Sequence, residues 1–170
     1  GVTQPGLSYQ LMPGLWVYLP VKEDIPKGMT WVLNEKDRPI IEAYLMARLT
    51  YFQAITSDPI NVDLPGWKQW YTDGGALYRP DLLARKKQGQ VADLDVGVVL
   101  RPQVIGEERT DTTAVVFDCF LDGGVFRLPD GSLAPGSTPG VVPYGSVARL
   151  SLTGSRWIVK QNGQQPDACL

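Results

Sequence analysis

Hydrophobic residues between positions 38 and 57 recur at the spacing of one helix face. The i, i+3, i+4 pattern of an amphipathic helix is followed by Ile40, Ile41, Tyr44, Leu45, Leu49, Phe52 and Ile55. We place Arg48 and Gln53 off this apolar stripe. Pro39 suits the first turn of a helix, and the residue before Pro59 disfavours helical conformation. The pattern therefore predicts a long amphipathic helix over residues 38–57.

Two shorter helices are predicted at residues 67–71 and 75–88. From residue 94 onward, hydrophobic and polar residues alternate with a period of two, which is typical of half-buried strands. About four antiparallel strands are expected, at residues 94–100, 112–121, 146–152 and 156–160. Because the helices come first and the hairpin-connected strands follow, this order favours an α+β fold with the helices on one face of a curved sheet.

The first 33 residues are interrupted by prolines and glycines, as in Pro5-Gly6 and Pro13-Gly14, and carry many hydrophobic side chains between them. Such side chains are costly to leave in water, so we expect an extended arm that lies on its own domain or on a partner. The predicted division is an apolar arm at residues 1–33 and a folded domain at residues 34–170.

The 170 residues are enough for one domain with a sizeable core. Histidine is absent, which excludes Ser-His-Asp and Cys-His nucleophilic sites and zinc sites with histidine ligands. The net charge of −2 argues against non-specific binding to nucleic acid. Because no apolar run reaches the roughly 18 residues of a membrane span, we expect membrane attachment only through an anchor outside this sequence.

Motifs for metals and cofactors are not found in the sequence. The candidate acidic residues follow no EF-hand or other ligand spacing: Asp93, Asp95, Asp111, Asp118 and Asp122. There is neither a P-loop nor a dinucleotide-binding fingerprint. We therefore expect no metal and no cofactor.

The two cysteines, Cys119 and Cys169, are either buried free thiols or one disulfide. Cys119 lies in a predicted strand, whereas Cys169 lies on a polar C-terminal tail, where a free thiol would be exposed and reactive. This position favours a disulfide that attaches the tail to the strand. Because structural disulfides persist in oxidising compartments, we expect an extracytoplasmic protein, either secreted or anchored at the cell surface.

Several segments between residues 36 and 170 resemble a known family. They are 43–45 (Ala-Tyr-Leu), 51–54 (Tyr-Phe-Gln-Ala), 99–104 (Val-Leu-Arg-Pro-Gln-Val), 115–122 (Val-Val-Phe-Asp-Cys-Phe-Leu-Asp) and 156–159 (Arg-Trp-Ile-Val). With the cysteine near the C-terminus, they resemble the NTF2-like (cystatin-like, SnoaL-like) domains of actinobacterial secreted proteins and lipoproteins. The resemblance implies a cone, in which a long N-terminal helix and two shorter helices pack on a strongly curved antiparallel sheet of about four strands. It also implies a disulfide between Cys119 and Cys169, an extracytoplasmic location, and a pocket at the open end of the cone.

Fold alone assigns no reaction, because this superfamily contains isomerases, dehydratases, cyclases and non-catalytic domains. We expect a non-catalytic binding or protein-interaction module of the cell envelope, whose partner is another protein, a small apolar ligand or a second copy of the chain. The candidate pocket residues are aromatic side chains and one carboxylate: Tyr44, Tyr51, Trp67, Trp70, Tyr71 and Asp118.

The alternative is a small enzyme that resembles SnoaL or ketosteroid isomerase. Asp118 would act as the base, and Tyr44 or Tyr51 would donate a hydrogen bond to the developing oxyanion. Strand alternation groups Asp118 with Val116 and Phe120 but does not tell which face points inward. Because Asp118 can equally be a structural carboxylate bonded to the backbone or to an arginine, no catalytic residue is assigned.

Overall fold

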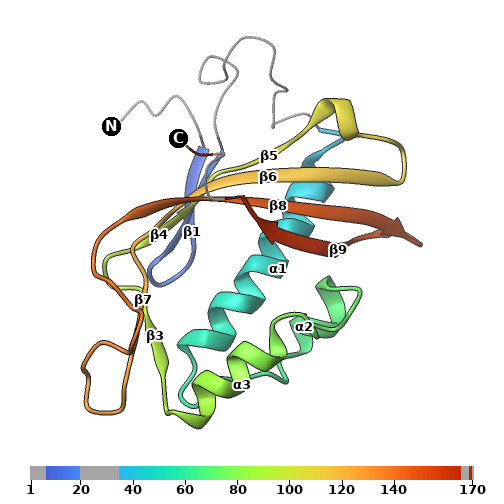
Figure 1. The fold of residues 1–170 in the computed structure, drawn as a ribbon. Coiled ribbons are helices and arrows are strands. Elements are labelled where there is room, and N and C mark those ends of the chain that lie inside the picture. Colours follow the sequence, from blue (N-terminus) through green and yellow to red (C-terminus); the bar gives the residue numbers. More distant parts are fainter. Residues whose placement is uncertain (1–6, 20–34, 166–168, 170) are drawn as a thin grey trace.

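The computed structural model describes residues 7–19, 35–165 and 169 (Figure 1). Its main sheet has seven strands in the order β1-β2-β4-β6-β8-β9, with β5 paired to β6. A second sheet pairs β3 with β7. The strands are β1 (Leu7–Met12), β2 (Leu15–Leu19), β3 (Val91–Asp93), β4 (Val98–Leu100), β5 (Pro102–Val104), β6 (Thr113–Asp122), β7 (Val125–Arg127), β8 (Val142–Thr153) and β9 (Arg156–Gln164).

The helices lie on one face of the main sheet (Figure 1). They are α1 (Arg38–Thr56), α2 (Pro65–Trp70), α3 (Arg79–Lys87) and a short 3₁₀ helix, η2 (Gly106–Glu108). Helix α1 lies between the sheet and the layer formed by α2 and α3, so residues on several of its sides are buried. Its bounds agree with the helix predicted at residues 38–57, except that it ends one residue earlier.

The expected cone, with an N-terminal helix on about four antiparallel strands, is wrong. Two strands, β1 and β2, precede α1, so the first helix is not N-terminal. The main sheet has seven strands and is mixed, because β2 runs parallel to β4 whereas the other paired neighbours are antiparallel. The architecture is therefore a seven-stranded mixed sheet covered on one face by three helices.

The difference arises mainly in the segment predicted as an extended arm. Pro13 and Gly14 form the turn of a hairpin between β1 and β2. Strand β2 alternates as a half-buried strand does, with Leu15, Val17 and Leu19 buried and the residues between them more exposed. Residues 7–19 therefore belong to the hydrogen-bonded sheet, whereas the rest of the predicted arm, residues 1–6 and 20–33, lies outside the described residues.

The C-terminal strands agree better with the sequence. The predicted strands at residues 146–152 and 156–160 form the β8–β9 hairpin, whose turn contains Gly154 with a φ of +64°. The strand predicted at 94–100 is shorter, because only Val98–Leu100 forms β4, and the preceding strand β3 belongs to the second sheet.

The hairpin turn at Gly14 requires glycine for two reasons. Its φ is +81°, and a Cβ atom there would lie 2.5 Å from the backbone oxygen of Leu94.

We expect Gly14→Ala to lower the free energy of unfolding by about 2–3 kcal/mol, since the positive φ alone costs about 1–2 kcal/mol. Urea denaturation followed by tryptophan fluorescence measures the change. The matched control is Gly154→Ala, where φ is also positive but nothing lies within 4 Å of the added Cβ. An equal loss in both variants would contradict the close approach to Leu94.

The predicted disulfide between Cys119 and Cys169 is confirmed, with a Cα–Cα distance of 5.5 Å. Cys119 is on the face of β6 opposite to the buried Asp118, so the bond attaches the C-terminal tail to the side of the sheet away from α1. Arg101 lies beside it and directs Nη2 to the Cys119 sulfur at 3.1 Å.

Candidate functional site

A pocket of about 260 Å³ lies where α1 meets the two sheets. Its walls come from α1, from both sheets and from the segment before α3: Arg48, Tyr51, Phe52, Ile55, Tyr78, Ala92, Leu94, Phe120, Asp122, Gly124, Val125, Phe126, Ser146, Asn162, Gly163 and Gln164. An apolar cavity of about 150 Å³ holds one benzene molecule. The pocket therefore has room for a benzene ring with a short substituent or for a small fused ring system.

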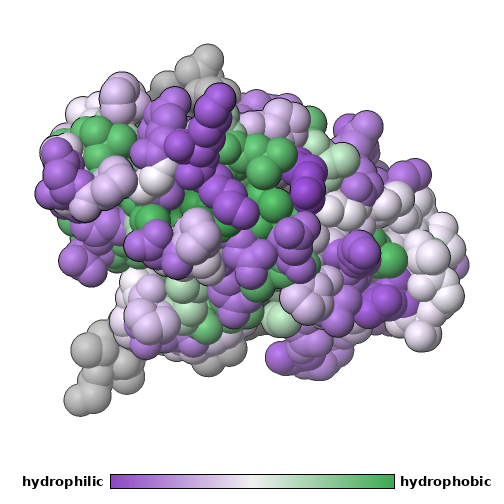
Figure 2. All heavy atoms as spheres, turned by 90° about the horizontal axis from the view of Figure 1, so that it is seen from below, coloured by the Kyte–Doolittle hydropathy of each residue, from purple (hydrophilic) through white to green (hydrophobic). Residues whose placement is uncertain are grey.

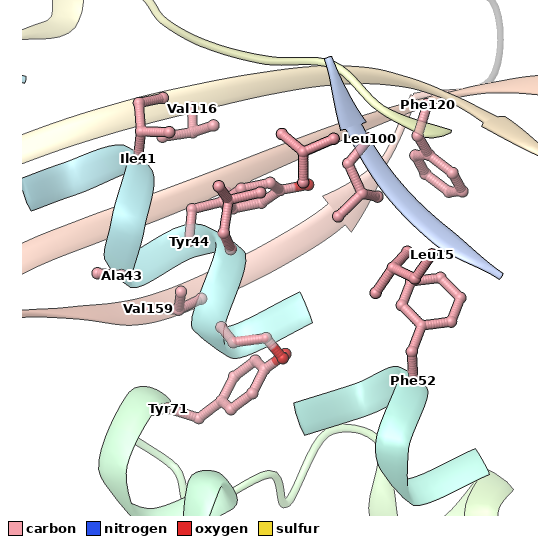
Figure 3. Packing of buried hydrophobic residues seen from close by; sticks show 14 of the residues in the cluster. Leu15, Ile41, Ala43, Tyr44, Phe52, Tyr71, Leu100, Val116, Phe120 and Val159 are labelled. Carbon is pink, nitrogen blue, oxygen red and sulfur yellow. The ribbon is translucent and has the colours of Figure 1, made fainter. Parts of the chain in front are cut away.

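Aromatic rings form much of the wall of this pocket. Tyr51 packs edge-on against Phe52 at 5.4 Å and lies 5.2 Å from Tyr78, both measured between ring centroids. In Figure 3, Phe52 of α1 and Phe120 of β6 point into the space between the helix and the sheet. This lining favours a ligand with an apolar body.

Arg48 brings a positive charge to the apolar wall. The residue is 6% exposed, and its guanidinium carbon lies 5.2, 5.1 and 5.2 Å from the ring centroids of Tyr51, Phe52 and Phe120. The prediction that Arg48 lies off the apolar stripe is wrong. It follows Tyr44 and precedes Phe52 by four residues each, which places it on the same buried side of α1.

Asp118 and Tyr44 form a buried pair between α1 and the sheet. Both residues are 0% exposed, and the Tyr44 hydroxyl donates to Asp118 Oδ2 at 2.6 Å. The backbone N–H of Arg101 donates to Asp118 Oδ1 at 2.7 Å. Burial raises the pKa of the Asp118 carboxyl, although the hydrogen bonds from Tyr44 and from the Arg101 amide oppose this shift. Neither Asp118 nor Tyr44 lines the pocket, so the pair lies in the core rather than at the ligand space.

The other predicted site residues divide between the pocket and the core. Tyr51 lines the pocket, and burial raises its pKa. Trp67 and Tyr71 pack together with ring centroids 5.3 Å apart, and the Tyr71 hydroxyl donates to the Ala47 carbonyl at 2.7 Å. Figure 3 shows the Tyr71 ring pointing toward α1. Trp70 lies beside Arg156, whose guanidinium carbon is 5.7 Å from its ring centroid. Of the six candidates, only Tyr51 is among the pocket residues.

Sequence reasoning did not select the polar residues that line the pocket, which include Arg48, Asp122 and Asn162. A signal for Arg48 was present, because an arginine four residues from two buried aromatics lies on the apolar side of a helix. Asp122 and Asn162 carry no such signal, because their positions depend on strand pairings far apart in the sequence.

Polar side chains at the rim of the pocket mostly bond to each other. The Ser146 hydroxyl donates to Asn162 Oδ1 at 2.7 Å, and Asn162 Nδ2 donates to the Tyr78 hydroxyl at 2.9 Å. Asp122 Oδ1 accepts from the Gly124 N–H at 2.8 Å, and burial raises the pKa of the Asp122 carboxyl. Among the described residues, no group of three or more His, Cys, Asp or Glu side chains is placed to hold a metal ion.

Comparison with known proteins gives information on the fold only. No family model matches the chain, and no curated protein matches it. Among solved structures, the chain is similar to the intermembrane space region of the chloroplast protein ARC6, with a TM-score of 0.56 and 10% sequence identity. The match covers 76% of this chain and 95% of that chain. It supports a shared arrangement of helices and strands, and the resemblance to actinobacterial NTF2-like domains stays a prediction.

Proposed function

We propose that this chain is a non-catalytic binding domain whose pocket beside α1 holds one small molecule with an apolar body. The observation that carries the proposal is the 260 Å³ pocket itself, which has aromatic walls and a few polar groups at defined positions. This combination is typical of small-molecule sites. That the domain also binds another protein, or a second copy of itself, stays a prediction.

The proposal includes an extracytoplasmic location, which the Cys119–Cys169 disulfide supports because such bonds persist in oxidising compartments. The similar ARC6 structure is also of an intermembrane space region. Within the described residues, no helix is both long and apolar enough to cross a membrane. The solvent-exposed face seen from below mixes hydrophobic and hydrophilic side chains (Figure 2).

A reaction of the isomerase type is not proposed, because of the position of Asp118. A general base must reach the proton that it removes. Asp118 is 0% exposed, accepts hydrogen bonds from Tyr44 and from a backbone amide, and is not among the pocket residues. The geometry therefore favours a structural role for this carboxyl.

A titration with indole, a neutral and largely apolar molecule, tests the proposed function. We expect binding at about millimolar concentration or tighter, because a ligand of this size gains only a few kcal/mol. Backbone amide signals of Gly124 and Gly163, which line the pocket, should shift in ¹⁵N–¹H NMR spectra.

Ala92→Phe places a ring in the pocket and should abolish these shifts, since Ala92 lines it. Ala76→Phe adds the same ring at an exposed position and should leave the shifts unchanged. The proposed function would be wrong if indole caused no shift in the wild-type protein, or if Ala92→Phe responded like the wild type.

A further inference from the structure

Arg48 is a buried cation that the Asp118 and Asp122 carboxyls attract without forming an ion pair with it. It is 6% exposed, and its Nε has no hydrogen-bond partner. Across the described residues, no carboxylate forms an ion pair with it. Burying a charge costs free energy unless the charge is paired and hydrogen-bonded. Burial of Arg48 therefore lowers the stability of the folded protein, and the surrounding residues offset only part of this loss.

The aromatic rings around Arg48 stabilise its charge but do not use its donors. The guanidinium lies about 5 Å from the centroids of Tyr51, Phe52 and Phe120. Such contacts attract a cation through the negative face of each ring, yet rings supply no strong acceptor for N–H groups. A guanidinium has five N–H donors in a planar fork. The pocket therefore contains donors in need of an acceptor.

The carboxyl groups of Asp118 and Asp122 interact electrostatically with Arg48, but neither of them accepts a hydrogen bond from it. The Asp118 carboxyl accepts from the Tyr44 hydroxyl and the Arg101 amide. The Asp122 carboxyl accepts from the Gly124 amide and lines the same pocket. No carboxylate of the described residues bonds to the Arg48 fork, so a molecule bound in the pocket can supply the acceptor.

We propose that the pocket binds a small monocarboxylate with an apolar body, and that the Arg48 guanidinium holds its carboxylate. The proposal rests on the proposed function, since it names the ligand class of the same pocket. A carboxylate matches the planar fork of arginine and forms the strong, charge-assisted kind of hydrogen bond. The Asp122 carboxyl also lines the pocket. It would repel the second carboxylate of a ligand that carried two, so a ligand with one carboxylate is favoured.

The test compares 3-phenylpropionate with 3-phenylpropionamide, which have nearly the same shape and differ in charge. We expect the carboxylate to bind about 10- to 100-fold more tightly than the amide, as judged from charged hydrogen bonds in proteins. Isothermal titration calorimetry or NMR titration of the intact chain measures both affinities. Equal binding of the two probes would overturn the monocarboxylate proposal while leaving the proposed function intact. Binding of neither probe would overturn both.

Variants of Arg48 connect this preference to the residue. Arg48→Met keeps an unbranched apolar side chain and removes the charge, so it should abolish the preference for 3-phenylpropionate and leave amide binding. Arg48→Lys keeps the charge without the fork and should retain part of the preference. An unchanged preference in the folded Arg48→Met variant would overturn the proposal. If that variant does not fold, an Arg48→Lys variant with the full wild-type preference overturns the assignment of the guanidinium fork.

Arg85→Met is the matched control. Arg85 stacks on the pocket residue Phe126 at 3.8 Å, but its guanidinium already bonds to Asp81 and Gln90. We expect this variant to bind both probes as the wild type does. Equal losses of carboxylate binding in the Arg48 and Arg85 variants would indicate a general effect of positive charge and overturn a specific role for Arg48.

Asp122→Asn gives an opposite expected result. It removes a negative charge from the pocket, and Oδ1 of asparagine can still accept from the Gly124 amide. The affinity for 3-phenylpropionate should therefore rise. A fall in that affinity would mean that Asp122 helps to hold the ligand, which would overturn the proposed arrangement of charges.

Discussion

Replacing Cys119 and Cys169 by serine should lower the free energy of unfolding by about 4 kcal/mol. The disulfide joins residues 50 positions apart, so it removes much freedom from the unfolded chain. The chain-entropy relation for a closed loop of this length gives about 4 kcal/mol. Urea denaturation followed by tryptophan fluorescence measures the loss. The midpoint should fall and the slope should rise somewhat, because the unfolded chain without the cross-link exposes more surface.

Reduction of the wild-type protein provides the control for this substitution. Dithiothreitol should produce nearly the same loss as the double serine variant, and it should have no effect on that variant. A loss of less than about 1 kcal/mol in the double variant would contradict the expectation. It would mean that the cross-link removes little conformational entropy from the unfolded chain. Two reactive thiols in the denatured, unreduced protein would contradict the disulfide itself.

Replacing Asp118 by alanine should cost about 4 kcal/mol of stability. The substitution leaves two buried donors, the Tyr44 hydroxyl and the Arg101 amide, without an acceptor. Each unpaired buried donor costs about 1–3 kcal/mol, and the removed carboxyl also leaves a small cavity. Thermal and urea denaturation measure the loss.

Asp118→Asn separates the shape of this side chain from its charge. The amide can accept from the Arg101 N–H through its oxygen and donate to the Tyr44 oxygen through its nitrogen, so we expect a change within about 1 kcal/mol at neutral pH. A large loss in this variant as well would mean that the negative charge, rather than the hydrogen-bond geometry, stabilises the core.

The difference in stability between the wild type and Asp118→Asn should depend on pH. Burial raises the pKa of Asp118 in the folded state above its unfolded value of about 3.9. A carboxyl of this kind contributes stability that is fully present below the unfolded pKa and is lost as the pH rises through the folded pKa. The stability of the wild type relative to Asp118→Asn should therefore be greatest in acid and decrease toward neutral pH. An increase over this range would contradict the raised pKa.

The elements that depend on local pattern could be predicted from the sequence, whereas the arrangement of the sheet could not. The helix at residues 38–56 and the hairpin with its turn at Gly154 are determined by periodicity and by a glycine in a turn. The pairing of β2 with β4 joins segments far apart in the sequence, and no local pattern specifies it. The prolines of the N-terminal segment indicated an irregular arm, although Pro13 is in the turn of a hairpin.

The candidate pocket residues were chosen mainly as aromatic side chains, so most of them belong to the core and not to the pocket. Tyr51 is in the pocket, but Trp67, Trp70 and Tyr71 belong to the packing around α1 and α2. Asp118 was named because it lies among apolar neighbours, and the same neighbours place it in the core. Arg48 was placed off the apolar stripe, although it lies on the buried side of α1.

The β1–β2 hairpin also protects the rest of the protein from unwanted association. Strand β2 covers the edge of β4, whose backbone N–H and C=O groups would otherwise be open to pairing with another chain. Val98 and Leu100 of β4 are 0% exposed in the folded chain. A fragment that began at residue 34, the start of the folded domain expected from the sequence, would lack both strands of this hairpin. Such a fragment would expose a hydrophobic sheet edge and would be prone to aggregate, so expression of this domain should include the residues of the hairpin.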